Sequence, residues 1–320
     1  ASTAAAAAKL VDGKVIQPRR ELSVLHETDV LVVGSGPGGL AAALAAAREG
    51  VDTMLVERYG CFGGVITQMG VEGIAWYRHS GTIESDGIGA EFEGLAKEMG
   101  SARQTLYSQS HALDAEMFKC IADRLVQEAG IVPLLHCLAV DAVMEGEIIR
   151  GVITESKSGR AAILAKRVID ATGDADIACR AGAPYRLDPK HTLEEVSVSF
   201  GCSGVDLERF FDYTLKNAKS VAEWGDASGT KEEDEFSTYL VEPFKKAKEA
   251  GEMPEYPRIE SYWHGFTDAG EIVGTLDAVY GRFAAADVSA GGQQAERFDL
   301  AAALAAAAAT VPRNLSASPR

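Results

Sequence analysis

Cysteine is scarce and scattered in this chain. Five occur among 320 residues, and no two of them form a C-x-x-C pair: Cys61, Cys120, Cys137, Cys179 and Cys202. An odd number without paired spacing excludes a disulfide framework, a zinc ribbon and a cysteine-ligated iron–sulfur cluster. No secretory signal pattern opens the sequence, so we expect a cytoplasmic protein.

Long hydrophobic runs and positive charge are also scarce. The longest fully apolar stretch is Leu300–Ala309, about half of the ~20 residues that cross a bilayer, so we expect no membrane span. Lys and Arg number 31 against 47 Asp and Glu, which gives a net charge of −16. Such a field repels nucleic acid, which we therefore do not expect as a partner. The remaining composition, 47% hydrophobic and 24% charged, is typical of a globular chain with a sizeable core.

The first strong pattern in the sequence is a strand–loop–helix–strand unit. Residues 30–33 are continuously apolar, residues 40–49 are an alanine-rich helix former stopped by Gly50, and residues 51–56 are again apolar. This order predicts a βαβ unit whose strands are buried on both faces. The loop between its first strand and its helix consists of Gly34, Ser35, Gly36, Pro37, Gly38 and Gly39.

Three glycines of this loop form a G-x-G-x-x-G fingerprint, which predicts a dinucleotide site in this context. Gly34 permits the tight turn, Gly36 lets a pyrophosphate approach the backbone, and Gly39 allows close packing of helix on strand. The helix N-terminus supplies N–H groups to the phosphates. Glu57 ends the second strand, where a carboxylate accepts both hydroxyls of an adenosine ribose. The alternative is a tight turn in an unrelated α/β protein.

The rest of the chain predicts further elements with less regular patterns. Helices are predicted at 89–99 and 114–129, followed by a meander of short strands. A half-exposed strand is predicted at 196–200, and charged amphipathic helices at 206–250. The meander strands are predicted at 132–138, 140–144, 148–154, 161–164 and 167–170.

Three segments carry a resemblance to a known family: Glu57–Gly64, Gly151–Gly159 and Val168–Asp176. With the glycine loop, they resemble the glutathione-reductase-like and fumarate-reductase-like FAD enzymes. The closer similarity is to the FAD-dependent oxidoreductase family related to the heterodisulfide reductase A flavin domain. It covers residues 15–205 well and 206–273 loosely.

The resemblance implies an α/β fold with a Rossmann-like FAD-binding domain, made of a parallel sheet with a β-meander, and a smaller α+β substrate or cap domain. The expected boundaries are 15–185 for the FAD-binding domain and 186–275 for the cap. Residues 276–320 are expected to return to the FAD domain, because Gly291–Ala295 resembles the start of the family's closing helix.

The resemblance also implies contacts to FAD, mostly by backbone. One group is expected near the pyrophosphate and ribityl chain, one strand residue beside the adenine, and a later turn over the adenosine side. Arg58 is expected over the adenine. The group near the pyrophosphate and ribityl chain is Gly63, Gly64 and Val65, the strand residue is Ala139, and the later turn is Ala171, Thr172, Gly173 and Asp174.

Catalytic side chains are predicted in the segment that should follow the flavin ring. Arg78 could bind a substrate carboxylate, while His79 or Tyr77 could move a proton; the alternative is an exposed polar loop. Cys61 has either a redox or covalent-flavin role or a packing role. No metal is expected: a metal site could involve Asp170, Asp174 and Asp176, but Asp170 ends a buried strand and these residues form no complete ligand set.

The sequence therefore predicts an FAD-dependent oxidoreductase that transfers a hydride between a small organic substrate and flavin N5. Two alternatives stay open. One is a flavin subunit of a larger electron-transfer assembly with a redox partner protein, and the other is a non-catalytic nucleotide-binding or scaffold protein. A homo-oligomer is compatible with each of them.

Overall fold

The structure is a computed structural model. It describes residues 7–72, 78–79, 83–84, 86–104, 111–186, 197–202, 219–220, 236–237, 249–251, 259–266 and 272–278. The chain divides into two compact units. Unit 1 comprises Ala1–Gly60 and Val126–Pro184, and unit 2 comprises Cys61–Leu125 and Tyr185–Arg320.

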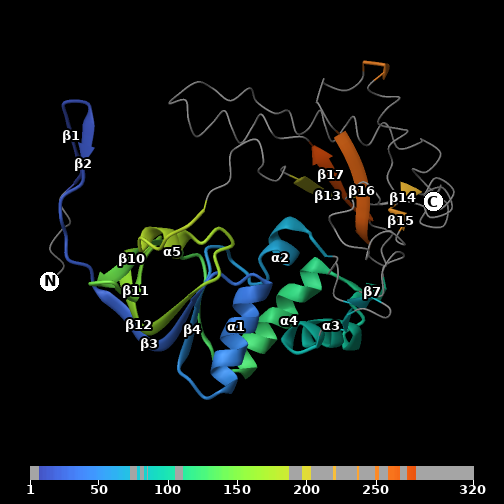
Figure 1. Ribbon diagram of the computed structural model, residues 1–320, viewed down its shortest axis with the longest axis horizontal. Coiled ribbons are helices and arrows are strands. Elements are labelled where there is room, and N and C mark those ends of the chain that lie inside the picture. Colours follow the sequence, from blue (N-terminus) through green and yellow to red (C-terminus); the bar gives the residue numbers. More distant parts are fainter. Residues whose placement is uncertain are drawn as a thin grey trace. The chain divides into compact units, whose positions relative to one another are not determined.

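A six-stranded mixed sheet is the centre of unit 1 (Figure 1), with the strand order β10-β11-β12-β3-β4-β9. Strands β12, β3, β4 and β9 run parallel to one another, and β10, β11 and β12 form an antiparallel meander. The strands are β3 (Val24–Val33), β4 (Thr53–Val56), β9 (Val132–Leu134), β10 (Leu138–Glu145), β11 (Ile148–Ser156) and β12 (Gly159–Asp170).

Burial explains why these strands lie at the centre of unit 1. All four residues of β4 are buried, as are the last three of β3, which matches strands covered on both faces. The helix α1 (Pro37–Arg48) packs against β3 and β4, and its buried side includes Leu40 and Leu44. The short helix α5 (Asp176–Arg180) packs against β10 and β12. The α/β class with a parallel sheet and a meander is thus confirmed.

Unit 1 differs from the sequence prediction in two places. The last meander strand is continuous from Gly159 to Asp170: its residues 159–164 pair with β11 on one edge, and its residues 162–170 pair with β3 on the other. A hairpin of β1 (Lys9–Val11) and β2 (Lys14–Ile16) precedes β3 and was not predicted.

The described residues of unit 2 form two longer helices, a short helix and several short strands. The longer helices α3 (Ile88–Glu98) and α4 (Ala115–Glu128) confirm the predicted helices, and the last three residues of α4 belong to unit 1. The five-residue helix α2 is Val65–Met69. Phe92 of α3 and Phe118 of α4 make an edge-to-face contact at 5.4 Å in the core of this unit.

The strands of unit 2 form small antiparallel sheets. Strand pairs join β5 with β6, β7 with β8, and β14 with β15, and a three-stranded sheet has the order β13-β17-β16. Their bounds are β5 (Arg78–His79), β6 (Ile83–Glu84), β7 (Ala102–Gln104), β8 (His111–Leu113), β13 (Ser197–Cys202), β14 (Lys219–Ser220), β15 (Phe236–Ser237), β16 (Ile259–Phe266) and β17 (Ile272–Ala278).

Strand β13 includes most of the strand predicted at 196–200, whereas β16 and β17 were not predicted. Most of the region 206–250 predicted as amphipathic helices, and the C-terminal segment after residue 278, lie outside the described residues. Where that region is described, β14 and β15 are strands, so the helix prediction is wrong at those four residues. Among the described residues, no helix combines the length and the apolar character that a bilayer crossing needs. The functional division into FAD-binding, cap and returning segments stays a prediction.

Candidate functional site

The glycine loop of unit 1 lies where three strands end together. Gly34 follows β3, and its N–H donates to the carbonyl of Val56 at the end of β4, 2.8 Å away. The N–H of Ala171, which follows β12, donates to the carbonyl of Val33, also at 2.8 Å. These two bonds extend the sheet by one residue on each side, so the loop is fixed to the carboxyl edge of the sheet. This edge is where open α/β folds bind ligands.

The three fingerprint glycines meet different surroundings. Gly34 has φ +94°, and a Cβ there would lie 2.4 Å from the Ala171 carbonyl oxygen. A Cβ on Gly39 would lie 1.9 Å from the carbonyl oxygen of Gly34, so only glycine lets α1 approach the loop. Gly36 is the contrast, because its Cβ position has no described heavy atom within 4 Å. Two glycines thus serve the protein's own packing, while the middle one faces open space.

The N-terminus of α1 supplies an electrostatic partner for that open space. Gly36 is the N-cap and Pro37 begins the helix, and no side chain of the described residues caps it. The first turn of α1 also carries no acidic residue. The N–H groups and the positive end of the helix dipole are therefore available for an anion beside Gly36. This arrangement fits a dinucleotide pyrophosphate.

Glu57 lies directly against this loop. Its side chain is 5% exposed, and its Oε2 accepts hydrogen bonds from the backbone N–H of Ser35 at 2.9 Å and the Ser35 hydroxyl at 2.7 Å. Its Oε1 accepts the N–H of Tyr59 at 2.8 Å. A carboxylate has about four lone-pair sites, so Oε1 keeps capacity for a hydroxyl donor. The contact joins the end of β4 to the loop after β3.

The turn after β12 is organised by Asp170. Its Oδ1 accepts hydrogen bonds from the N–H and the hydroxyl of Thr172, at 3.1 and 2.7 Å. Its Oδ2 accepts the N–H groups of Ile177 and Ala178 in α5, at 2.9 and 2.8 Å. Burial opposes ionisation of Asp170, but the bonds from Ala178, Thr172 and Ile177 outweigh it and lower the pKa of this carboxyl. Asp170 thereby fixes the segment Ala171–Gly173 beside Gly34.

A second glycine turn, in unit 2, precedes α2. Gly63 has φ +113°, and a Cβ on it would lie 2.4 Å from Cγ2 of Thr67. The Thr67 hydroxyl donates to the carbonyl of Phe62 at 2.7 Å, which closes the turn. Cys61 is partly buried, and the side-chain amide of Gln68 lies 2.6 Å from its sulfur. The turn is thus held by its own side chains.

The predicted cofactor residues divide between the two units. Unit 1 brings together the glycine loop, Glu57 and the turn of Ala171, Thr172 and Gly173. Gly63, Gly64 and Val65 belong to unit 2. Ala139 lies on β10, half-buried and packed against the core of unit 1.

Two further residues lie nearer to solvent. The Arg58 guanidinium is 4.7 Å from the Tyr59 ring centroid, a cation–π contact. Asp174 is exposed.

The predicted catalytic residues lie only partly within the described residues. Tyr77 lies outside the described residues, and Arg78 and His79 are described by their backbone, as strand β5. Their catalytic roles stay predictions.

Two structural roles were missed by the sequence prediction. Asp170 was considered only as a metal ligand, whereas all its contacts are to donors of its own turn and of α5. Its position at the end of a buried strand, before Thr172 and Gly173, is the signal that could have indicated this role. The bond from Ser35 to Glu57 was also missed, because it joins residues 22 positions apart. Among the described residues, no group of three or more His, Cys, Asp or Glu is placed to hold a metal ion.

The sequence also matches known proteins. Residues 29–298 match the family model described as FAD dependent oxidoreductase. A thiamine thiazole synthase of Metallosphaera sedula is 32% identical over 161 residues, which are 47% of this chain and 55% of that protein. Digeranylgeranylglycerophospholipid reductase 1 of Methanopyrus kandleri is 32% identical over 171 residues, 52% of this chain and 45% of that protein. The chain thus spans about half the length of these curated relatives.

Solved structures show a weaker likeness. A geranylgeranyl bacteriochlorophyll reductase-like protein of Thermoplasma acidophilum has a TM-score of 0.47 at 16% identity, over 79% of this chain and 57% of that chain. The THI4 protein of Thermovibrio ammonificans has a TM-score of 0.37 at 24% identity, over 48% of this chain and 61% of that chain.

Proposed function

Because this chain belongs to the FAD-dependent oxidoreductase family, we propose that it catalyses hydride transfer between a small organic substrate and N5 of FAD. FAD is the cofactor of the family, and when bound it supplies the two-electron chemistry. The observation that carries the proposal is the open position at Gly36, beside a helix N-terminus without an acidic residue. Gly34 and Gly39 of the same loop are closed by backbone atoms, so the open position at Gly36 leaves room for a pyrophosphate beside the helix N-terminus.

The protein's own residues would supply binding and orientation. The N–H groups at the start of α1 would donate to the pyrophosphate, with Gly36 allowing close approach. Glu57 would accept a ribose hydroxyl on Oε1 while Ser35 holds Oε2. The turn of Ala171–Gly173, Ala139 and Arg58 would line the adenosine side.

Further contacts are proposed from the family resemblance. Gly63, Gly64 and Val65 would pass close to the pyrophosphate and ribityl chain, and Asp174 of unit 1 would add a polar contact. Arg78 would bind an anionic group of the substrate, and Tyr77 or His79 would transfer the accompanying proton. This division leaves the hydride to the cofactor and gives the side chains proton transfer and positioning.

Anaerobic reduction of the purified protein tests the proposal. Reconstituted with FAD, it should show the two absorption bands of oxidised flavin, and a small organic substrate should bleach the band at longer wavelength. Bleaching that requires a partner protein would instead support an electron-transfer subunit. A colourless protein that FAD cannot reconstitute would contradict both and favour a non-catalytic scaffold.

A further inference from the structure

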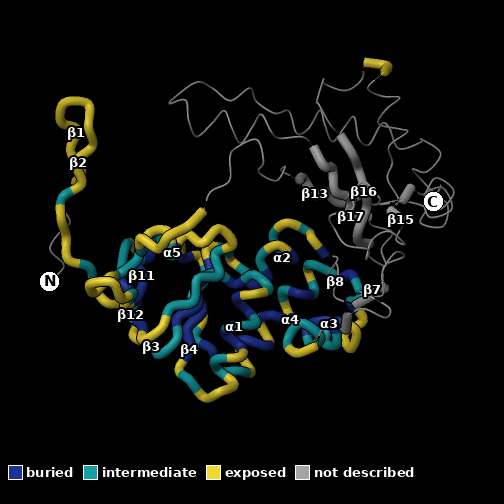
Figure 2. The backbone as a smooth tube through the Cα atoms, in the orientation of Figure 1, coloured by how far each residue is buried: buried dark blue, intermediate teal, exposed yellow. Residues whose placement is uncertain are grey.

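The hairpin of β1 and β2, with the residues that follow it to residue 21, is called the arm below, and its two strands pack against no other described element. Every residue of its two strands is exposed (Figure 2). Four of these residues are apolar, with exposed fractions of 75% for Leu10, 49% for Val11, 73% for Val15 and 52% for Ile16. An isolated two-stranded hairpin is marginally stable in water, and exposed apolar side chains gathered on one element mark an interaction surface.

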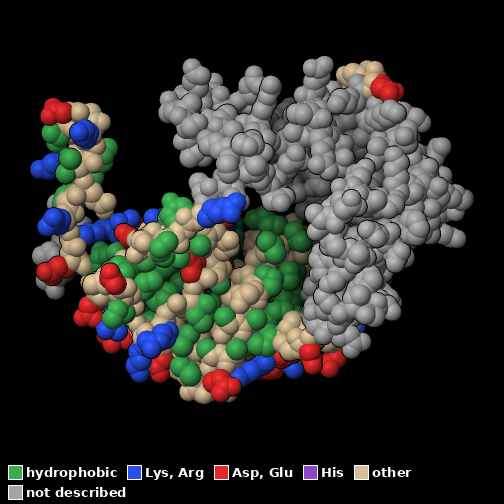
Figure 3. Space-filling model, in the orientation of Figure 1, with side chains coloured by type: hydrophobic (Ala, Val, Ile, Leu, Met, Phe, Trp, Pro, Cys, Tyr) green, Lys and Arg blue, Asp and Glu red, His purple; other side chains and the backbone are tan. Residues whose placement is uncertain are grey.

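The arm is basic, unlike the chain as a whole. Between residues 9 and 21 there are four cations and two acids, whereas the full chain carries −16. The cations are Lys9, Lys14, Arg19 and Arg20. Figure 3 shows Lys and Arg side chains, in blue, along this arm. An acidic surface would therefore attract the arm.

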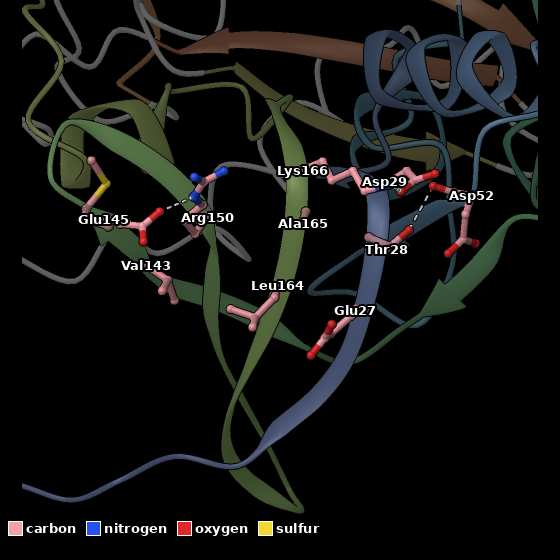
Figure 4. A pocket seen from close by; sticks show the side chains of 11 residues that line it. Glu27, Thr28, Asp29, Asp52, Val143, Glu145, Arg150, Leu164, Ala165 and Lys166 are labelled. Carbon is pink, nitrogen blue, oxygen red and sulfur yellow. Dashed lines mark hydrogen bonds and ion pairs between the residues drawn. The ribbon is translucent and has the colours of Figure 1, made fainter.

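Unit 1 contains a surface hollow that is acidic, whereas the arm is basic. It has a volume of about 520 Å³ and crosses the sheet from β10 to β3 (Figure 4). Leu164, Val143 and Ala165 give it an apolar lining. Its charged residues are four acids and two bases: Glu27, Asp29, Asp52, Glu145, Arg150 and Lys166.

Two of these acids are neutralised and two are not. Lys166 pairs with Asp29 at 2.5 Å and Arg150 pairs with Glu145 at 2.7 Å. Glu27 and Asp52 are exposed, and the described residues offer neither of them a cationic partner. The hollow therefore presents the carboxylates of Glu27 and Asp52 beside an apolar lining. Both features are complementary to the hairpin, which carries two lysines beside its exposed apolar side chains.

The arm and the hollow are also complementary in their backbones, because each has a free strand edge. Strand β10 contributes Val143, Met144 and Glu145 to the hollow, and it is an outer strand of the six-stranded sheet. Among the described residues it pairs on one side, with β11, and the arm has free strand edges. Free edges of this kind bind one another by strand addition.

We propose that the arm of one molecule binds the hollow of a second copy of this chain, so that two copies exchange arms. In the structure the arm does not cover the hollow of its own chain, since both the arm and Glu27 are exposed. Reciprocal exchange makes two identical contacts about a two-fold axis, the commonest symmetry of soluble oligomers. The charges that attract the arm are then those of the partner copy.

Charge reversal tests this exchange in the full chain with FAD present. The variant K9E/K14E makes the arm acidic, and E27K/D52K makes the hollow basic; multi-angle light scattering and sedimentation measure the mass of each. The wild type should have twice the chain mass, and each variant alone should dissociate at least tenfold more readily. An equimolar mixture should restore the dimer, because both of its contacts then join opposite charges.

The variant E49K/E98K, which changes two exposed acids outside the hollow by the same charge, is the matched control and should stay dimeric. Circular dichroism and the flavin spectrum show whether each variant is folded. A wild type that stays monomeric overturns the proposal, including the case in which hydrogen exchange shows the arm protected on its own chain. Dimers that survive both reversals overturn it as well.

Discussion

Ser35 donates two hydrogen bonds to one oxygen of Glu57, from its N–H at 2.9 Å and from its hydroxyl at 2.7 Å. Ser35 is fully buried and Glu57 is 5% exposed, so water cannot replace the hydroxyl easily. The pair fixes the carboxylate at the end of β4 against the loop that starts α1. The position of Glu57 relative to Gly36 therefore depends on this serine.

Replacing Ser35 by alanine should weaken both the fold and cofactor binding. The buried carboxylate loses one donor, which costs about 1–3 kcal/mol of unfolding free energy. We expect the dissociation constant of FAD to rise about tenfold, roughly 1.4 kcal/mol, because Glu57 is less well oriented. Urea unfolding of the apoprotein and a fluorescence titration with FAD measure the two effects.

The matched control is Ser158→Ala, at an exposed residue of the β11–β12 turn. It should change neither stability nor FAD affinity. If Ser35→Ala behaves like this control, the serine does not hold Glu57 in solution.

Local signals in the sequence were enough for the βαβ unit and the glycine fingerprint. Residues 30–33 are continuously apolar, residues 40–49 are a strong helix former, and the loop between them has the required glycines. Contacts between distant segments were not predictable in the same way. The bond of Ser35 to Glu57 and the bonds of Asp170 to α5 depend on which strands become neighbours.

The missed elements have a related cause. The strands β1 and β2 lack the polar–apolar alternation that indicates a half-buried strand. The Asp12-Gly13 turn between them, with φ positive at both residues, is the signal that could have indicated the hairpin. Residues 161–164 and 167–170 were predicted as separate strands because the exposed Lys166 interrupts the apolar pattern. In the sheet its side chain alternates to the other face, and β12 continues.

Asp170→Asn should destabilise the protein at neutral pH by about 1–3 kcal/mol, because four donors face the carboxylate. The folded state lowers the pKa of Asp170 below its unfolded value of about 3.9. Its stabilisation is therefore present above about pH 4 and is lost as the pH falls through the folded-state pKa.

The difference in unfolding free energy between wild type and Asp170→Asn should thus shrink below about pH 4. Asp141→Asn, at an exposed residue of β10, serves as the control and should show no such change. A difference that is constant from pH 3 to pH 7 would be inconsistent with an ionised Asp170 holding the turn.

The cysteines should react with thiol reagents in an order set by burial. Cys120 and Cys179 are exposed, whereas Cys137 is buried. Burial raises the pKa of the Cys137 thiol, against the opposing effect of a hydrogen bond with Thr154. We expect Cys137 to react at least about tenfold more slowly than Cys179, since the thiolate is the reactive form.

Bound FAD should slow the labelling of Cys61 and leave Cys179 unchanged. Cys61 is partly buried and lies two residues before Gly63 of the second glycine turn. Mass spectrometry after timed alkylation, with and without FAD, measures both rates. Equal labelling of Cys61 in the two samples would show that this turn does not contact the bound cofactor.

Arg78→Ala and His79→Ala should each impair catalysis without loss of flavin, the first through KM and the second through kcat. We expect Arg78→Ala to raise KM about tenfold by removing a cation for the substrate. His79→Ala should lower kcat about a hundredfold by removing a proton-transfer group. Arg167→Ala, at an exposed residue of β12, is the control. Wild-type kinetics in both variants would show that neither residue of β5 has a catalytic role.

The most direct test of the dinucleotide site compares two alanine substitutions in the glycine loop. A Cβ on Gly39 would meet the Gly34 carbonyl oxygen at 1.9 Å, whereas a Cβ on Gly36 would meet no described atom within 4 Å. Gly39→Ala should therefore lower the melting temperature of the apoprotein. Gly36→Ala should leave it unchanged and instead obstruct the pyrophosphate.

The decisive measurement is the flavin content of Gly36→Ala after reconstitution with FAD and desalting, read from the absorption spectrum beside the wild type. We predict a yellow wild type and a folded Gly36→Ala protein that has lost most of its flavin. A Gly36→Ala protein that retains as much FAD as the wild type would contradict the account.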